Sequence, residues 1–235
     1  MKGFTMITYL QVEQLLHNFK KCLAYNETPH WAVRDKKARY LAASPDYVHL
    51  LAQADTPLTV AALDLDEISK ASLLYQDSLA FKRQDKLTSL QAVIVKERLA
   101  LLEVTRYPLH DADNPSSPLA LGITIRKIHN PEQLNSAELV SAHIPNNLSN
   151  ELKERDLLIG LLLLDNCPQK TIARYLQISH SRLRHILFRI CRRNFGVTGG
   201  GANFRELFIQ HALYRQIPLG TLKTYLTLTN SCSIS

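Results

Sequence analysis

Five arginines lie between residues 180 and 193, interleaved with apolar residues at helical spacing. A guanidinium group is permanently charged and presents five N–H donors in a planar fork, which matches the paired oxygens of anionic groups. His185 and Phe188 belong to the same segment and add a hydrogen-bonding ring and an apolar ring. These residue types favour recognition of a polyanion by charge and hydrogen bonding.

The positive charge is concentrated in the last part of the chain. The 235 residues carry a formal net charge of +7, from 28 basic and 21 acidic side chains. Residues 1–145 contain 16 of each kind, whereas residues 146–235 contain 12 basic and 5 acidic side chains. After Asp165 the sequence has one acidic residue, Glu206. This split predicts two domains, the second of which faces a polyanion.

The segment 168–193 has the layout of two helices joined by a tight turn. Pro168 suits the first position of a short helix, because its missing N–H would have no partner there. Ser179 is predicted to cap the longer helix that follows. Apolar residues recur on that helix at i, i+3, i+4 and i+7, at Leu183, Ile186, Leu187 and Ile190. This pattern predicts a helix-turn-helix unit with a buried stripe.

The opposite face of the longer helix is polar and basic, which fits a DNA major groove. Residues near the start of such a helix reach base edges, so Arg184 and His185 are expected to select sequence. Arg189, Arg192 and Arg193 are expected to bind phosphate. The candidate DNA contacts are Lys170, Thr171, Ser179, Ser181, Arg182, Arg184, His185, Phe188, Arg189, Arg192 and Arg193.

Residues 148–215 resemble the LuxR/FixJ-type helix-turn-helix family. The matching positions are Ile172-Ala173, Leu176, Ile178-Ser179, Leu183-Arg184 and Gly196-Val197. The chain departs from the family at Ile186, where a histidine is frequent, and in the insertion of residues 198–202. The resemblance implies sequence-specific binding of double-stranded DNA, whereas the insertion predicts a fourth helix that is placed differently from that of the family.

The first part of the chain alternates helical and β-type patterns. Helices are predicted over residues 7–25 and 66–82. A short helix is predicted between them, with Ser44 as its N-cap and Pro45 at its first position. A hairpin is predicted around a turn at Asp35–Lys37, and three further strands at Ala92–Lys96, Leu99–Leu109 and Leu119–Ile128, with a loop at 110–118. This order predicts an α+β domain, a five-stranded antiparallel sheet with helices on one face.

That order resembles the PAS sensor fold, through Asn26–Tyr47 and Leu102–Asp113, although another small α+β domain would also fit the pattern. The resulting interpretation is a PAS-like sensor or dimerisation domain at 1–130, a linker at 131–148 and an all-α helix-turn-helix domain at 149–235. Ser149 is expected to cap the first helix of that domain. A PAS domain ahead of a LuxR-type unit is also similar to the TraJ-type activators of conjugative plasmids.

Several other chemistries find no support in the sequence. The four cysteines are widely spaced, which favours free thiols over a disulfide frame or a zinc site. The longest apolar block, Leu157–Leu164, is far shorter than a membrane span. Gly199–Gly201 lacks the Gly-Lys-Ser/Thr ending of a phosphate loop and is expected to be a connector. His110, Asp111 and Asp113 read as a solvated loop and not as a metal site. We therefore expect a cytoplasmic protein that uses no cofactor and is not an enzyme.

Two classes of function remain open at this point. The first is a DNA-binding transcription regulator that acts as a homodimer. The second is an interaction module whose basic helix docks on an acidic partner, such as a subunit of RNA polymerase. For the dimer, Asn203 and Glu206 are expected to form a capping box on a fourth helix that leaves Ile209 and Leu213 unburied. The alternative is that the tail 219–228 folds back over them; the N-terminal helix is a second candidate dimer surface.

Overall fold

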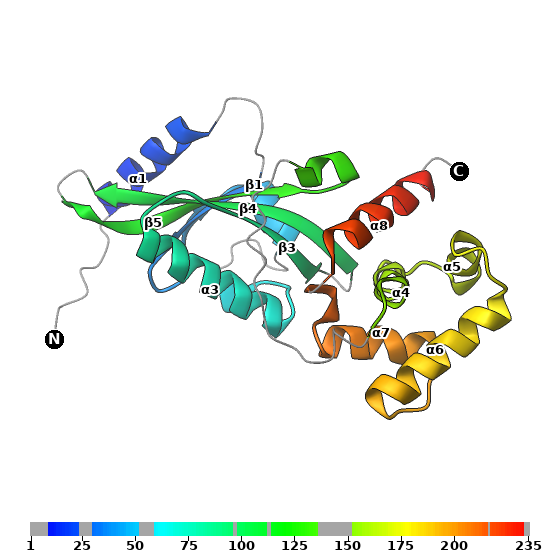
Figure 1. Ribbon diagram of the computed structural model, residues 1–235. Helices are drawn as coiled ribbons and strands as arrows, with labels where there is room; N and C mark the ends of the chain where they lie inside the picture. The colour runs from blue at the N-terminus through cyan, green and yellow to red at the C-terminus, as the bar shows by residue number, and fades with distance from the viewer. Residues whose placement is uncertain are drawn as a thin grey trace. The chain divides into compact units, whose positions relative to one another are not determined.

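The computed structural model describes residues 9–23, 30–51, 59–95, 98–111, 114–135, 152–215 and 217–232 (Figure 1). The chain divides into two compact units, one containing most of a β-sheet with its helices and one containing the C-terminal helices. Each unit is described by itself.

The sheet unit is built around five antiparallel strands. The strands are β1 (His30–Asp35), β2 (Tyr40–Ala43), β3 (Leu87–Val95), β4 (Arg98–Asp111) and β5 (Asn114–Lys127). Their order in the sheet is β2-β1-β5-β4-β3, so the last strand in sequence lies at the centre, between β1 and β4. This arrangement confirms the predicted α+β class and agrees with the PAS-like pattern inferred from the sequence.

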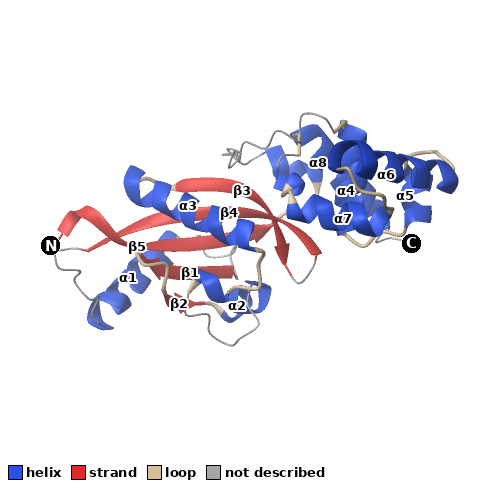
Figure 2. Cartoon of the chain, turned by 90° about the horizontal axis from the view of Figure 1, so that it is seen from below, coloured by secondary structure: helices blue, strands red, loops and turns tan. Residues whose placement is uncertain are grey.

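Helices α1 (Tyr9–Cys22) and α3 (Glu67–Arg83) cover opposite faces of the sheet (Figures 1 and 2). Successive strand residues point to opposite faces, so neighbours in sequence meet different helices. Val33 of β1 packs against Phe19 of α1, whereas the next residue, Arg34, pairs with Asp77 of α3. The expectation that the helices lie on one face was therefore wrong, because strand alternation gives each face its own buried set of side chains.

Helices α2 (Pro45–Leu51) and α3 begin within one residue of their predicted starts, and each has a side-chain cap. Helix α2 begins after Ser44, whose Oγ accepts a hydrogen bond of 3.2 Å from the backbone N–H of Tyr47. A 3-10 helix covers Val60–Ala62. Asp66 caps α3 by accepting from the N–H of Ser69 at 3.0 Å. Side-chain oxygens thus satisfy N–H groups that have no partner inside the helix.

Strands β4 and β5 extend further than predicted. His110 and Asp111 belong to β4, where they are registered with Pro118 and Asn114 of β5. The predicted loop at 110–118 was therefore wrong, because pairing along the hairpin overrode the loop-like composition. Asp111 also accepts a hydrogen bond of 2.8 Å from Gln11 of α1, while Asp113 lies outside the described residues.

The helical unit consists of α4 (Glu154–Leu164), α5 (Gln169–Tyr175), α6 (His180–Phe195), α7 (Gly201–Gln210), a 3-10 turn at Leu213–Arg215 and α8 (Leu219–Cys232). Every residue of α4 from Asp156 to Leu164 is buried, and α7 and α8 pack against it. Phe208 of α7 lies so close to the backbone at Gly160 that no larger residue would fit there without displacement. An apolar helix surrounded by other helices is the core of this unit.

The structure corrects several predicted helix starts in this unit. The cap of α4 is Lys153 and not Ser149, which lies outside the described residues. Pro168 precedes α5 as its N-cap. Helix α7 begins at Gly201 after Gly200, so Asn203 cannot cap it and the capping box with Glu206 was wrong.

The expected apolar patch for a partner is also absent. Leu213 is fully buried and Ile209 is half-buried, so neither is an exposed partner surface. The tail forms α8, which packs against α4.

The predicted domain boundaries, at residues 130, 131–148 and 149, stay predictions, since residues 136–151 lie outside the described part of the chain. Within the described part, a 3-10 helix covers Pro131–Asn135. Across the described residues, no helix combines the length and hydropathy that crossing a bilayer requires.

Candidate nucleic-acid interface

Helices α5 and α6 are joined by a tight turn that the local sequence dictates. Ile172 and Ala173 of α5 are buried, and the carbonyl of Ala173 accepts a 3.0 Å hydrogen bond from the N–H of Ile178. Gln177 adopts a left-handed conformation with φ of 53°, which reverses the chain within the turn. The two helices therefore pack against each other as a helix-turn-helix pair (Figure 1).

Both ends of α6 are capped. The Oγ of Ser179 accepts a hydrogen bond of 3.1 Å from the N–H of Arg182, as the sequence predicted. At the other end Gly196 has φ of 69°, and the N–H of Val197 donates to the carbonyl of Cys191 at 3.2 Å. The N–H of Gly196 itself donates to the carbonyl of Arg192 at 3.2 Å, which is an αL termination, in which glycine occupies the left-handed position without a steric penalty. The caps set where the exposed face of the helix begins and ends.

The buried stripe of α6 agrees with the predicted one. Its apolar members are each at most 4% exposed: Leu183, Ile186, Leu187 and Ile190. Cys191 extends the stripe by one residue, and burial raises the pKa of its thiol, which makes it a packing residue and not a nucleophile. The stripe fixes the rotation of α6 about its axis, so the opposite face must point to solvent.

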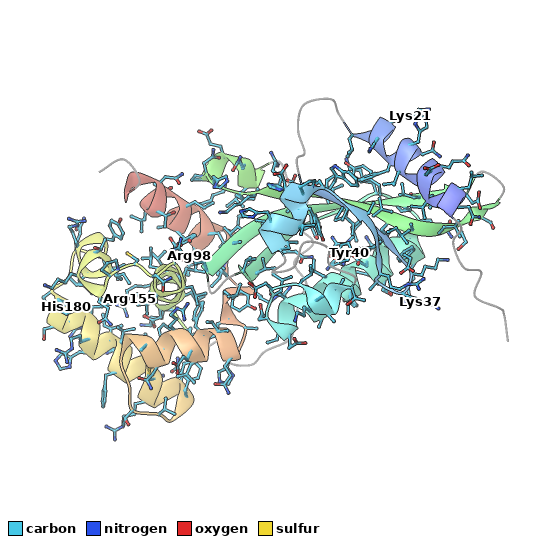
Figure 3. All side chains as sticks on the ribbon, turned by 180° about the vertical axis from the view of Figure 1, so that it is seen from behind. Lys21, Lys37, Tyr40, Arg98, Arg155 and His180 are labelled. Atoms are coloured by element: carbon cyan, nitrogen blue, oxygen red, sulfur yellow. The ribbon has the colours of Figure 1, made fainter. Side chains whose placement is uncertain are left out.

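That opposite face, which we call the basic face, presents the polar residues selected from the sequence. Its exposed members on α6 are Ser181, Arg182, Arg184, His185, Phe188, Arg189, Arg192 and Arg193. Phe188 is 44% exposed, an unusual position for a large aromatic side chain. His180, labelled in Figure 3, marks the beginning of the helix. Lys170 on α5 is exposed and Thr171 is half-buried.

Within the described part of the chain, acidic side chains do not neutralise the charges of the basic face. Among the described residues, no ion pair involves an arginine of α6, whereas arginines elsewhere pair with Asp77, Asp35, Glu103 and Asp156. Five unpaired guanidinium groups on one helix produce a local positive potential. Such a potential attracts a polyanion and repels a cationic partner.

A groove of about 600 Å³ lies beside the start of the basic face. Its lining comprises Gln169, Ser181, Arg184, His185, Leu187, Phe188 and Gly199–Gly201. Sequence reasoning missed Gln169 and treated Gly199–Gly201 only as a connector. The glycine run was the available signal, because backbone without side chains leaves room for close approach. Gly201 is in addition packed tightly against the side chain of Gln169.

The part of the chain that the structure describes does not contain the arrangement of side chains that a metal site requires. No group of three or more His, Cys, Asp or Glu side chains there could hold a metal ion. The basic face contains donors and an apolar ring but no paired acid and base. Its positive charge favours contact with an anionic surface.

The fold and the helix pair together define a protein with a sheet domain and a helix-turn-helix unit. No family model and no curated protein sequence matches the chain. Among solved structures the chain is similar to a phage VqmA in complex with DPO, at 21% identity and a TM-score of 0.45, over 91% of this chain and 95% of that one. It is also similar to the VqmA dimer of Vibrio cholerae, at 16% identity and a TM-score of 0.44, over 88% and 91%.

A third similarity covers about half of this chain. The PAS domain of BvgS from Bordetella pertussis is 16% identical with a TM-score of 0.37, over 51% of this chain and 91% of that one. All three TM-scores lie below 0.5, so our functional proposal rests on the residues of the basic face.

Proposed function

We propose that this protein is a DNA-binding transcription regulator that reads sequence with the basic face of α6. The observation that supports the proposal most directly is the exposure of five unpaired arginines opposite a fully buried apolar stripe, on the second helix of a helix-turn-helix pair. The recognition helix in such pairs lies in the major groove with its N-terminal residues on base edges.

Roles within the basic face follow from position along the helix. Arg184 and His185 lie near its start and line the groove, so we assign them to base edges. Phe188, beside them, suits contact with a thymine methyl group. Arg189, Arg192 and Arg193 lie further along the helix, where they are assigned to phosphates.

We propose that the protein acts as a homodimer and that its sheet domain, over residues 1–130, senses a signal or mediates the dimer. A single helix-turn-helix unit contacts few base pairs, and dimers bind half-sites about 34 Å apart or at a multiple of that distance. In this proposal residues 131–148 form a linker and residues 149–235 form the DNA-binding domain. Binding to DNA implies a cytoplasmic location. Contact with RNA polymerase and the TraJ-like resemblance stay predictions.

The test is a gel-shift series with the full chain on fragments of the neighbouring genome, at two salt concentrations. Binding of DNA through phosphates releases counterions, so the affinity is expected to fall steeply with salt. Arg193→Ala should weaken binding to all fragments and reduce the logarithmic salt slope by about 1. The matched control is Arg83→Ala, which removes an exposed arginine from the end of α3 and should leave binding unchanged.

A docking module for an acidic protein would give a different result. Such a protein would produce no footprint and no preference among fragments, and Arg193→Ala would leave the residual DNA binding as weak as before. A strict monomer on one half-site, seen by sedimentation with a palindromic fragment, would contradict the dimer alone.

A further inference from the structure

A second group of arginines lies inside the sheet domain. Arg34 of β1 and Arg106 of β4 are 1% and 0% exposed, and both pair with Asp77 of α3. The Nη2 of Arg34 is 2.9 Å from Oδ2 of Asp77, and the Nε of Arg106 is 2.7 Å from Oδ1. Arg106 also donates from Nη1 to the Oγ of Ser89 at 3.0 Å. One carboxylate is thus shared by two buried guanidinium groups.

The negative charge that would balance the second guanidinium is missing from the described interior. Burial lowers the pKa of Arg34, but Asp77, Tyr40 and Tyr47 together raise it, to a net value above the ordinary one. Burial lowers the pKa of Arg106, yet arginines stay protonated in proteins. The only other buried carboxylate of this domain among the described residues, Asp35, is held by Arg39 at 2.7 Å and by two backbone N–H groups of its own turn. The cluster therefore carries one excess positive charge.

The neighbouring tyrosines do not supply the missing charge. The ring of Tyr40, labelled in Figure 3, lies 5.3 Å from the guanidinium carbon of Arg34, and its hydroxyl is 2.8 Å from that of Tyr47. Burial raises the pKa of Tyr40, and it raises that of Tyr47 well above the ordinary value. Both hydroxyls are therefore neutral at physiological pH.

Three nitrogen atoms of the cluster have no hydrogen-bond partner among the residues that the structure describes. They are Nε and Nη1 of Arg34 and Nη2 of Arg106, all of them fully buried. Burying a charged donor without an acceptor costs much free energy in the folded state, so its presence in a folded core needs a physical explanation. An acceptor that is anionic would satisfy the donors and the charge together.

A cleft lies beside the cluster on the α3 side. It has a volume of about 340 Å³ between α3 and the β1–β2 turn; Asp77 belongs to its lining, whereas Arg34 and Arg106 do not. Lys36 and Lys82 are exposed residues of the same lining. The carboxylates of Asp35 and Asp77 belong to the same lining, so the cleft carries two charges of each sign.

We propose that the sheet domain binds a small organic monocarboxylate, held by Arg34 and Arg106 beside Asp77. A monoanion matches the excess of one charge, whereas a dianionic phosphate would exceed it. A planar carboxylate also matches the fork of guanidinium donors. The site belongs to the sheet domain and stands whether or not α6 binds DNA.

The first arm of the test supplies the missing charge by mutation, with no ligand. Ser89→Asp places a carboxylate beside Nη1 of Arg106, and Ser89→Asn places a neutral group of the same shape there. In the full chain without added carboxylate, Ser89→Asp should melt at least about 3 °C above Ser89→Asn. A melting temperature equal to or below that of Ser89→Asn would overturn the proposal, because the charge would already be balanced.

The second arm measures thermal unfolding of the full chain in sodium acetate, pyruvate and benzoate, at constant ionic strength. Acetamide and benzamide are the neutral controls, and sodium phosphate tests the dianion. At least one carboxylate should raise the melting temperature with concentration, beyond its amide and beyond phosphate, because binding to the folded state stabilises it. The rise should disappear in Ser89→Asp, or in Arg106→Met if the first variant does not fold.

Two results of the second arm would refute the proposal. A rise of equal size in wild type and in the charge-balanced variants would show that the carboxylates bind elsewhere. No rise with any of the three carboxylates in wild type would also refute a monocarboxylate site. Loss of DNA binding by the α6 variants would bear on neither outcome.

Discussion

Arginine has opposite surroundings in the two units of this chain. On α6 five arginines are exposed and unpaired, whereas in the sheet domain Arg34 and Arg106 are buried against one aspartate. An exposed guanidinium keeps its hydration and creates an external field, at little cost to stability. A buried one loses that hydration, so the fold depends on its partner. The exposed arginines are therefore available to bind a ligand, whereas the stability of the fold depends on the pairing of the buried ones.

The largest effect is expected from removing the shared carboxylate of the sheet domain. Asp77→Asn leaves both buried guanidinium groups without an anion, and breaking a buried pair costs about 3–5 kcal/mol. Urea unfolding of the full chain measures the loss. The matched control on the same helix is Glu67→Gln, since the side chain of Glu67 is 88% exposed and its pair with Lys70 should contribute less than about 0.5 kcal/mol. Equal losses would break the distinction between the two kinds of arginine.

On the basic face the expected loss is in DNA affinity and not in folding. Arg184→Ala should weaken binding to the preferred site by about 1–3 kcal/mol and relax the preference at one base pair. The free energy of unfolding should stay within about 0.5 kcal/mol of wild type, because the side chain is exposed. Competition gel shifts with single-base variants of the site measure the first quantity. Weakening that is uniform across all variants would instead assign Arg184 to phosphate.

The cap of α6 should contribute a smaller amount to stability. Ser179→Ala removes the acceptor for the N–H of Arg182, and loss of an N-cap costs about 1 kcal/mol. Thermal unfolding measures this change. Ser181→Ala is the control, as an exposed serine inside the first turn of the helix. If both variants lost the same stability, the cap would not be what holds the start of the basic face.

The smallest effect is expected where an arginine is only partly exposed. Arg126 and Glu103 pair at 2.7 Å across β5 and β4, with the two side chains 41% and 16% exposed. Glu103→Gln should cost about 0.2–1 kcal/mol, because solvent screens such a pair. Urea unfolding should place this variant well below Asp77→Asn. A loss as large as that of Asp77→Asn would show that burial does not decide the role of an arginine in this sheet.

Local signals in the sequence were sufficient for α6 and its surroundings. Apolar residues repeat with the helical period, Ser179 precedes the helix and Gly196 follows it, and each of these signals spans only a few residues. The basic face could therefore be predicted, and the exposure of its side chains agrees with the prediction. Its use for DNA binding stays a proposal.

Signals that depend on distant partners were less reliable. Asn114 and Pro118 suggested a loop, but pairing with β4 extends the strand through both residues. Asn203 suggested a cap, but α7 begins three residues earlier than such a cap predicts, at Gly201, which packs against Gln169. In each case a contact with another element outweighed the local preference.

By itself the sequence determined most of the elements, the split of charge and the basic face, because helical period, caps and composition act over a few residues. Only the tertiary structure decided that Arg34, Asp77 and Arg106 share one buried site. Asp77 is 43 residues from Arg34 and 29 from Arg106, and three separate elements carry them. Whether two arginines are solvated or buried around one carboxylate depends on how strands and helix pack. No local pattern in the chain encodes that packing.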